Sequence, residues 1–545
     1  MRKTTKRRRD PAAEAVAEPG GGVGSSILRN LGAAAGGAVA GFGWLPPHSP
    51  MLVVVGLAAV LYAGKRAGGP KGLATASFGG AIVYYAIANR PLVSAVSWGG
   101  WGADGGPTMG SPAWWLLNSL WMMLTVACSL FAIAAITLTA RFAARRASLR
   151  IVLLATTWVA IAEWLRSVLL WRFEWGFLGL ALAEVPALRQ WSSVGGILLL
   201  SAGLVAASAV LVELATAESR RRLTIGAGAL VAAPVVWLGG VALEPSVGPQ
   251  APEVRVAAFQ FAPPVPPAGE TTLGVSADWM AALPRVVERG YRLIVLPESI
   301  SSHAVQLDGV PAAKLGADRQ VSADSWRLAL DPLLRDTDTF IALGVEGAEA
   351  GTTYNTTTLW NRDGLVGWQH KVRLVPFAEY LPAGWGFLGS QALTYYEAGD
   401  RFRPIAAGPL QIGAFICQEV QHSAAARELA RRGANLLISG GNDGVFADRR
   451  VAQVHHSMAR IRATEVGRFL VRAMKNGVTS IVSPSGETVG QSPSEDAALI
   501  GGTVSLRSAS TLYARFGAWP LLVCAVVLLA VSRRSSAGDH GSPAR

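Results

Sequence analysis

The chain has 545 residues, of which 51% are apolar and only 16% are charged, and its mean hydropathy is +0.34. These values exclude an ordinary soluble protein and indicate membrane-spanning segments. The formal net charge of +13 would suit a nucleic-acid-binding protein. However, the basic residues form short runs between apolar segments, and no groove-reading motif is present. We therefore expect the membrane as a partner and no nucleic acid.

The N-terminal segment 1–26 is first basic and then small and polar. Such a composition cannot bury enough apolar surface to fold, so we predict a disordered cytoplasmic tail. The first apolar run comes late and several others follow it, so a cleaved signal peptide is not expected.

Eight apolar segments are candidates to cross a bilayer about 30 Å thick. Seven form a predicted transmembrane bundle over 27–244, and the eighth is a predicted C-terminal transmembrane helix. The segments are 27–44, 51–64, 73–97, 114–140, 150–172, 189–213, 223–243 and 514–532. The first two are short, so they either cross at a tilt or form a re-entrant pair around Pro46, Pro47 and Pro50.

The basic residues lie in alternate loops of this arrangement, and the loops between them carry almost none. The basic runs are Arg2–Arg9, Lys65–Lys71, Arg141–Arg150, Arg220–Arg222 and Arg533–Arg534. Because short loops rich in lysine and arginine stay in the cytoplasm, both termini are predicted there, including a tail over 533–545. The segment after the seventh span is then predicted to face outside.

Between 252 and 506 the composition becomes that of a globular domain. Short β-branched runs alternate with amphipathic helical patterns, which is typical of buried strands in a layered α/β domain. The predicted strands are 254–262, 292–298, 339–347, 356–361, 410–417, 434–441, 468–474 and 479–486, and the predicted helices are 324–335, 423–432 and 449–466.

Three reactive side chains lie at the ends of these strands. Glu298 ends the apolar strand of LIVLPES, Lys371 lies in WQHKVRLVPFAEYLP, and Cys417 ends the strand of IGAFICQEV. A thiol is a weak nucleophile until it loses its proton. A buried carboxylate can accept that proton, and an ammonium group can stabilise an oxyanion. Singly, each residue also suits a structural role, but together they predict an acyl-transfer site.

Several histidines are alternatives to this set. His455 and His456 are adjacent on a predicted helix, so their side chains diverge by about 100° and cannot share a metal as an i, i+4 pair could. His370 precedes Lys371 on a strand and should therefore point away from Cys417. We expect no metal site.

The charged residues Glu163, Arg166 and Arg172 fall inside a predicted span. Charged residues at this depth can mark an ion pathway. Because Glu163 and Arg166 are spaced three apart on a helix, we expect these two to form an intrahelical pair facing the bundle interior.

Four segments resemble motifs of the nitrilase superfamily: LPES, HKVRLVPFAEYLP, ICQE, and RATEVGRFLVRAMKNGVTSIVSPSG over 462–486. With an apolar bundle before them and an apolar segment after them, the chain is similar over nearly its whole length to bacterial apolipoprotein N-acyltransferases. The loop SGGNDGVFADR (439–449) keeps Asn442, Asp443 and Phe446 of the loop expected there.

The resemblance implies a role for each matching residue. Glu298 matches the general base, Lys371 the oxyanion-stabilising lysine and Cys417 the nucleophile, while Glu379 and Glu419 match supporting carboxylates. It also implies an αββα sandwich beside the membrane bundle, with no cofactor.

The implied reaction is ping-pong. The thiolate accepts an acyl chain from a phospholipid, and the free α-amine of a diacylglyceryl-modified N-terminal cysteine of a lipoprotein then receives it. The implied location is the bacterial inner membrane, with the catalytic domain on the outer face. We expect a monomer, because the flanking spans restrict assembly through the sheets.

Two other classes of function remain open. A membrane-tethered nitrilase-type amidase would hydrolyse a small-molecule C–N bond, with water as the acceptor. A transporter or structural membrane protein would carry a degenerate nitrilase domain, which the intact set of Glu298, Lys371 and Cys417 disfavours. The acceptor that reaches the thioester would separate transferase from amidase.

Overall fold

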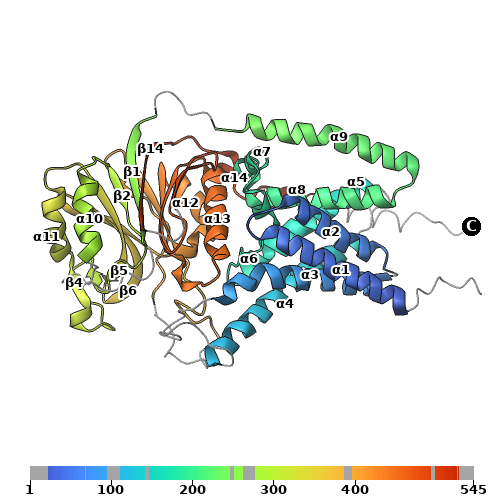
Figure 1. The fold of residues 1–545 in the computed structure, drawn as a ribbon, viewed down its shortest axis with the longest axis horizontal. Coiled ribbons are helices and arrows are strands. Elements are labelled where there is room, and N and C mark those ends of the chain that lie inside the picture. The colour runs from blue at the N-terminus through green and yellow to red at the C-terminus, as the bar shows by residue number, and fades with distance from the viewer. Residues whose placement is uncertain are drawn as a thin grey trace, which may run out of the picture.

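The computed structural model describes residues 23–67, 69–94, 111–141, 147–245, 251–261, 277–385, 396–492, 497–524 and 526. These residues form a helical bundle and an α/β domain that meet end to end (Figure 1). Most of the predicted N-terminal tail and all of the tail over 533–545 lie outside the described residues.

The bundle follows the predicted apolar segments closely. Its helices are α1 (Val23–Trp44), α2 (Pro50–Lys65), α3 (Gly69–Asn89), α4 (Pro112–Arg141), α5 (Ala147–Thr157), α8 (Ser192–Thr216) and α9 (Ser219–Ala242). A π-helical stretch, η3 (Trp158–Leu165), and α6 (Arg166–Leu169) continue α5. Three short helices connect the longer ones: η2 (Arg90–Ser94), η4 (Leu178–Leu182) and α7 (Pro186–Arg189).

Four helical stretches are long and apolar enough to cross a membrane. They are Trp114–Ala140, Ile151–Leu169, Ser192–Thr216 and Ser219–Ala242, with Pro50–Lys65 a shorter apolar helix. The predicted count of about eight spans is therefore not reached within the described residues. The predicted span 514–532 is interrupted: α14 (Leu512–Phe516) ends at Gly517, whose φ is 63°, and the chain becomes helical again at 520.

Glycines allow the first three helices to pack backbone against backbone. A Cβ atom added to Gly37 on α1 would lie 2.0 Å from the Gly80 carbonyl oxygen on α3. One added to Gly56 on α2 would lie 2.4 Å from the Ala40 nitrogen on α1. Small residues of this kind are typical of helix contacts in membranes, where close approach gives dispersion contacts that lipid would otherwise provide.

The α/β domain is built on one extended sheet. Its path runs β4-β3-β5-β2-β1-β11-β10-β9-β8, while β6, β7, β12, β13 and β14 pair off this path. The first strands are β1 (Glu253–Phe261), β2 (Leu293–Val295), β3 (Ala304–Gln306), β4 (Gln320–Ser322), β5 (Phe340–Glu349), β6 (Thr352–Asn361) and β7 (Gly364–His370). The others are β8 (Ile405–Ala407), β9 (Leu410–Ile416), β10 (Leu436–Asn442), β11 (Leu470–Lys475), β12 (Ser480–Val482), β13 (Thr488–Gln491) and β14 (Ala498–Ser505).

The sheet folds on itself between two pairs of helices, which gives four layers. Helices α10 (Ala277–Val287) and α11 (Ala323–Leu334) cover one outer face, and α12 (Ser423–Arg431) and α13 (Arg450–Val466) cover the other (Figure 1). The alternation of β1 shows the two faces: Val256 and Ala258 enter the inter-sheet core, whereas Ala257 and Phe259 pack under α10 and α11.

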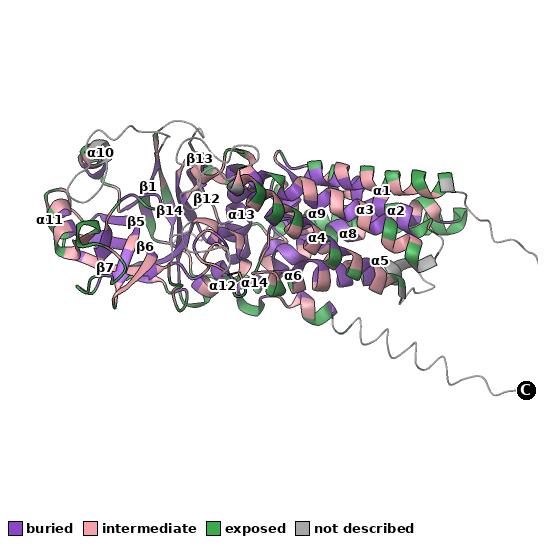
Figure 2. Cartoon of the chain, turned by 90° about the horizontal axis from the view of Figure 1, so that it is seen from below, coloured by how far each residue is buried: buried purple, intermediate pink, exposed green. Residues whose placement is uncertain are grey.

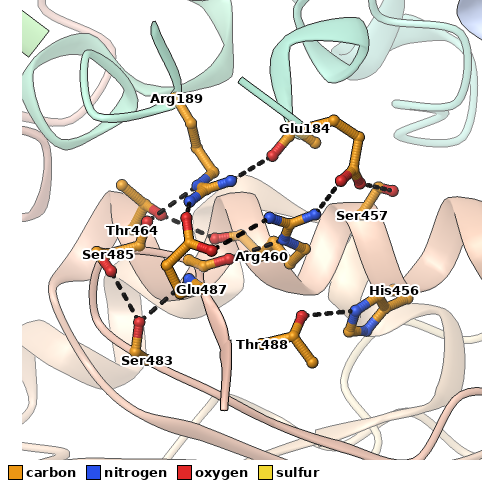
Figure 3. Close-up of polar contacts among 12 residues, drawn as sticks. Glu184, Arg189, His456, Ser457, Arg460, Thr464, Ser483, Ser485, Glu487 and Thr488 are labelled. Carbon is orange, nitrogen blue, oxygen red and sulfur yellow. Dashed lines mark hydrogen bonds and ion pairs between the residues drawn. The ribbon is translucent and has the colours of Figure 1, made fainter. Parts of the chain in front are cut away.

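Helix α13 lies between the sheet and the bundle, and Figure 2 shows it almost wholly buried. Its polar side chains pair with the bundle through a group that we call the docking cluster, formed by Glu184, Arg189, Arg460 and Glu487 (Figure 3). Arg189 is fully buried, donates to the Ser485 carbonyl oxygen at 2.9 Å and pairs with Glu487. Arg460 pairs with Glu184. The docking cluster therefore ties both parts together.

A glycine at the turn between β12 and β13 makes room for this cluster. Gly486 has a φ of 80°, and an added Cβ atom would lie 2.4 Å from Arg189 Nε and 2.5 Å from Thr464 Oγ1. We expect Gly486→Ala to lower the free energy of unfolding by about 2–4 kcal/mol, because left-handed strain adds to displacement of a buried ion pair. Thermal unfolding of the purified protein measures this loss.

Gly408→Ala is the matched control for that variant. Gly408 also has a left-handed φ, 61°, but an added Cβ atom there would meet nothing within 4 Å. The control therefore carries the backbone strain without the contact. Equal losses of stability in the two variants would contradict the role given to the docking cluster.

Candidate active site

Cys417 lies where β9 ends and a short 3-10 turn, Cys417–Gln421, begins. Its φ of 55° is left-handed, which costs a non-glycine residue about 1–3 kcal/mol. On the neighbouring strand β10, a Cβ atom added to Gly441 would lie 3.2 Å from Cys417 Cα. The strand end and this close neighbour thus hold the thiol on a sharp turn, half-buried at the edge of the sheet.

A buried lysine joins two carboxylates in the same site. Lys371 Nζ lies 2.8 Å from Glu379 Oε1 and 3.5 Å from Glu298 Oε1, and only 1% of its side chain is exposed. Asn355 on β6 bridges the same carboxylates, because Nδ2 donates to Glu298 Oε1 at 2.6 Å and to Glu379 Oε1 at 3.0 Å. The Val375 N–H donates to Glu379 Oε2 at 2.7 Å. The orientation of both carboxylates is therefore fixed.

Glu419 acts on the backbone around the cysteine. Its Oε1 accepts from the N–H groups of Val372 and Arg373 at 2.7 and 2.9 Å, and its Oε2 accepts from the Ile416 N–H at 2.9 Å. This one carboxylate therefore ties the segment after Lys371 to the residue before Cys417.

Burial and charge shift the ionisation of these groups. Burial and the nearby Glu298 charge raise the pKa of the Cys417 thiol well above its usual range, against the opposing effect of Lys371. Burial alone would lower the pKa of Lys371, but Glu379 and Glu298 raise it above its usual value. Burial raises the pKa of Glu419 to about 7. The resting thiol therefore keeps its proton, and Cys417 could act as a nucleophile only if a base removed that proton.

A cavity of about 340 Å³ connects these groups to the bundle. Glu298, Lys371, Glu379 and Cys417 line it from the α/β domain. The facing wall is mainly apolar and comes from η2 and α4: Leu92, Val93, Leu117, Leu120, Trp121, Met123 and Leu124. Its size is that of a small-molecule ligand pocket, and it is shared by both parts of the chain.

The structure brings together four of the five predicted site residues around this cavity. Glu419 is the exception, since it lies fully buried behind the wall and reaches the site through backbone groups. His370 does not line the cavity, as expected: its Nε2 lies 2.5 Å from Glu349 Oε2 and its ring stacks on Tyr354 at 4.0 Å. It is therefore no base for the cysteine.

Sequence reasoning missed the parts played by Asn355 and His455. His455 lines the cavity, and its Nδ1 lies 2.7 Å from Asp443 Oδ1. Burial alone would raise the pKa of Asp443, but His455 and Arg472 lower it below its usual value. An asparagine within a strand carries no sequence pattern that marks it as part of a site, whereas Asp443 belongs to a loop that the family motif had marked.

Among the described residues, no cluster of three metal-ligating side chains is present.

The expected pair of Glu163 and Arg166 is wrong. Arg166 donates to the Trp175 carbonyl oxygen at 2.8 Å and contacts Cys128 Sγ at 3.3 Å, while Glu163 Oε1 accepts from the Leu178 N–H at 2.9 Å. The π-helical stretch η3 ends between these residues, so the ordinary i, i+3 spacing does not apply across them. Each side chain instead fixes a different part of the connection after α6.

Two family models match the chain. The apolipoprotein N-acyltransferase N-terminal domain matches residues 36–210, and the carbon-nitrogen hydrolase domain matches residues 255–513. An apolipoprotein N-acyltransferase of Gloeobacter violaceus is 27% identical, with 95% of this chain and 96% of that protein covered. The chain belongs to the apolipoprotein N-acyltransferase family.

Other members of the apolipoprotein N-acyltransferase family are similar over shorter lengths. The protein of Azotobacter vinelandii is 29% identical, with 71% of this chain and 74% of that protein covered. Among solved structures, an amidase from Nesterenkonia sp. AN1 is similar at 20% identity and a TM-score of 0.36, with 50% of this chain and 98% of that chain covered.

Proposed function

We propose that this chain N-acylates bacterial lipoproteins, with a phospholipid as the acyl donor and a thioester on Cys417 as the intermediate. The observation that carries the proposal is the cavity in which Cys417, Glu298 and Lys371 face an apolar wall supplied by the bundle. Such a wall buries acyl methylene groups at about 0.8 kcal/mol each. The names of the chain's relatives support the same reaction.

In the first half-reaction, Glu298 removes the thiol proton as Cys417 Sγ attacks an ester carbonyl of the phospholipid. Lys371 Nζ stabilises the tetrahedral oxyanion. The C–O bond then breaks, and Glu298 returns the proton to the departing oxygen. The products are a thioester on Cys417 and a lysophospholipid.

In the second half-reaction, the α-amine of the diacylglyceryl-modified cysteine attacks the thioester carbonyl. The C–N bond forms, the C–S bond breaks, and Glu298 accepts the amine proton and returns it to the thiolate. Asn355 holds Glu298 throughout, and Glu379 holds Lys371. Glu419 keeps the backbone around the nucleophile in place.

The proposed topology has about eight spans in the inner membrane and both termini in the cytoplasm. In chain order, a cytoplasmic tail over 1–26 leads into the bundle over 27–244. The catalytic domain on the outer face follows over 252–506. The C-terminal transmembrane helix, 514–532, then leads into the second cytoplasmic tail, 533–545. The basic residues at the end of α2 and in the first turn of α9 lie at helix ends remote from the α/β domain (Figure 1), which supports this orientation. We also propose that the protein is a monomer.

The amidase alternative accounts for the catalytic groups but not for the apolar wall. A small amide offers few methylene groups for Leu117, Leu120 and Met123 to contact. Water would also have to reach the thioester faster than the lipoprotein amine does. The transferase therefore agrees better with the cavity.

Intact mass after incubation with a defined phospholipid tests the proposal. We expect the wild-type protein to gain the mass of one acyl chain, in an adduct that hydroxylamine removes, and Cys417→Ser to gain none that is hydroxylamine-labile. Adding a diacylglyceryl-cysteine peptide should then discharge the adduct onto its amine. Folded wild-type protein that forms no adduct with any of several phospholipids, or an adduct that only water discharges, would refute the proposal.

A further inference from the structure

An arginine lies in the chain connection that leaves the bundle beside the catalytic cavity. Arg172 follows α6, at the end of the bundle that meets the α/β domain (Figure 1). Its side chain is exposed, yet it lines the same cavity as Cys417. A cation is thus available on the wall of a cavity that also presents an apolar face and the side chains of Cys417, Glu298 and Lys371.

The backbone holds this arginine in an uncommon conformation. Trp171 and Arg172 have φ values of 45° and 61°, and each left-handed non-glycine residue costs about 1–3 kcal/mol. The Trp171 ring packs edge-on against Phe377 at 5.2 Å between centroids, and Phe377 packs on Trp385 at 5.1 Å. These contacts with the α/β domain hold the turn from which the Arg172 side chain projects.

Arg172 has no ion pair with a protein carboxylate within the ranges that the structure describes. Burial, and after it the Arg172 charge, lower the pKa of Arg373, while the carboxylates of Glu419, Glu428 and Glu174 act in the opposite direction. Carboxylates therefore compensate the charge of Arg373, whereas no ion pair among the described residues does so for Arg172. An arginine without an ionic partner can bind an anion through charge-assisted hydrogen bonds.

We propose that Arg172 binds the phosphodiester of the phospholipid donor while the acyl chain lies against the bundle wall, an inference that rests on the proposed function. A phospholipid carries its phosphate a few bonds from the ester that Cys417 attacks. The cavity presents a cation, a nucleophile and an apolar wall to those three parts of one molecule. The diacylglyceryl acceptor carries no phosphate, so Arg172 would act on the donor alone.

An arginine that merely lies in water at the membrane surface would show neither the fixed turn nor the cavity position. The basic runs of this chain otherwise gather at the opposite helix ends, such as Arg220–Arg222 in the first turn of α9. Arg172 departs from that pattern, and it lines the cavity that also holds Cys417.

The rate of thioester formation on the full-length protein tests the inference with two donors of identical acyl chains. One donor is a phosphatidylglycerol or phosphatidylethanolamine, and the other is the corresponding phosphate-free diacylglycerol. We expect Arg172→Gln to lower kcat/KM for the phospholipid about 10- to 100-fold, as for a lost hydrogen bond to a charged group. The rate with diacylglycerol should stay unchanged, and Arg172→Lys should retain part of the phospholipid rate.

Arg335→Gln is the matched control, because Arg335 is an exposed arginine on the distant end of α11. It should alter neither rate. An equal fall with both donors after Arg172→Gln would overturn the inference, as would an unchanged phospholipid rate. Inorganic phosphate forms a third arm: no inhibition is expected, whereas inhibition of the wild type alone would assign the site to a free ion. Failure of the wild type to form any thioester would instead refute the proposed function.

Discussion

Replacing Lys371 with methionine is expected to lower the rate of thioester formation by about 10²–10³-fold or more. The ammonium group lies within 3.5 Å of Glu298 and 2.8 Å of Glu379. Its loss removes the proposed oxyanion stabiliser and leaves two neighbouring carboxylates buried without this cation. Uncompensated buried charge of this kind costs about 3–5 kcal/mol. We therefore expect the variant to lose both activity, measured by acyl-adduct mass, and thermal stability.

A double variant separates these two losses. Lys371→Met combined with Glu379→Gln removes one of the stranded charges, so it should recover much of the stability. It should recover none of the thioester formation, because no cation faces the carbonyl oxygen. A double variant that regains both properties would show that Lys371 acts only by balancing charge. A single variant with near wild-type rate would remove Lys371 from the mechanism altogether.

Gly344→Ala is expected to displace Glu298, the proposed general base, without changing its side chain. Gly344 lies on β5, and a Cβ atom added there would lie 2.5 Å from the Pro297 carbonyl oxygen and 2.6 Å from Glu298 Cα. Both are backbone atoms, so the segment that carries Glu298 must shift. A displacement approaching 1 Å can cost about 10²-fold in rate. We expect a fall of that size in thioester formation, with a smaller fall in melting temperature.

Gly490→Ala is the comparison for this second variant. Gly490 is also a strand glycine, but its added Cβ atom would meet only the Ile500 Cγ2 methyl, at 3.0 Å. The side chain of Ile500 can move, so the rate should stay near that of the wild type. If Gly344→Ala retained the wild-type rate in a folded protein, the position of Glu298 relative to Cys417 would not govern the reaction.

The sequence predicted the long strands well because each was a continuous buried run. β5 and β9 follow the predicted runs closely, whereas β3, β4, β7, β8 and β13 were missed. β3, β4 and β8 have three residues each, too few to show a period. β14 was missed for another reason: Gly501 and Gly502 break its pattern, yet eight of its residues pair with β1. Long-range pairing, which no local pattern records, makes that strand.

The candidate site divides in the same way. Cys417 and Glu298 could be selected because each follows an apolar run, where strand ends gather in a layered α/β domain. Asn355 could not, since it lies within a strand among threonines and gains its role only from the carboxylates beside it. Arg172 lies at the edge of a predicted span, and its place beside the cavity depends on contacts between distant segments.

The cavity described above has its reacting atoms on one part of the molecule and most of its apolar wall on the other. In the proposed reaction, a substitution in η2 or α4 can therefore alter which acyl chains fit the cavity, while Glu298, Lys371 and Cys417 stay in place. Lipid preference can then diverge between organisms with different membranes without a matching change in the chemistry. In the same way, the α/β domain supplies the reacting groups, whereas the bundle supplies the wall against which the proposed acyl chain would lie.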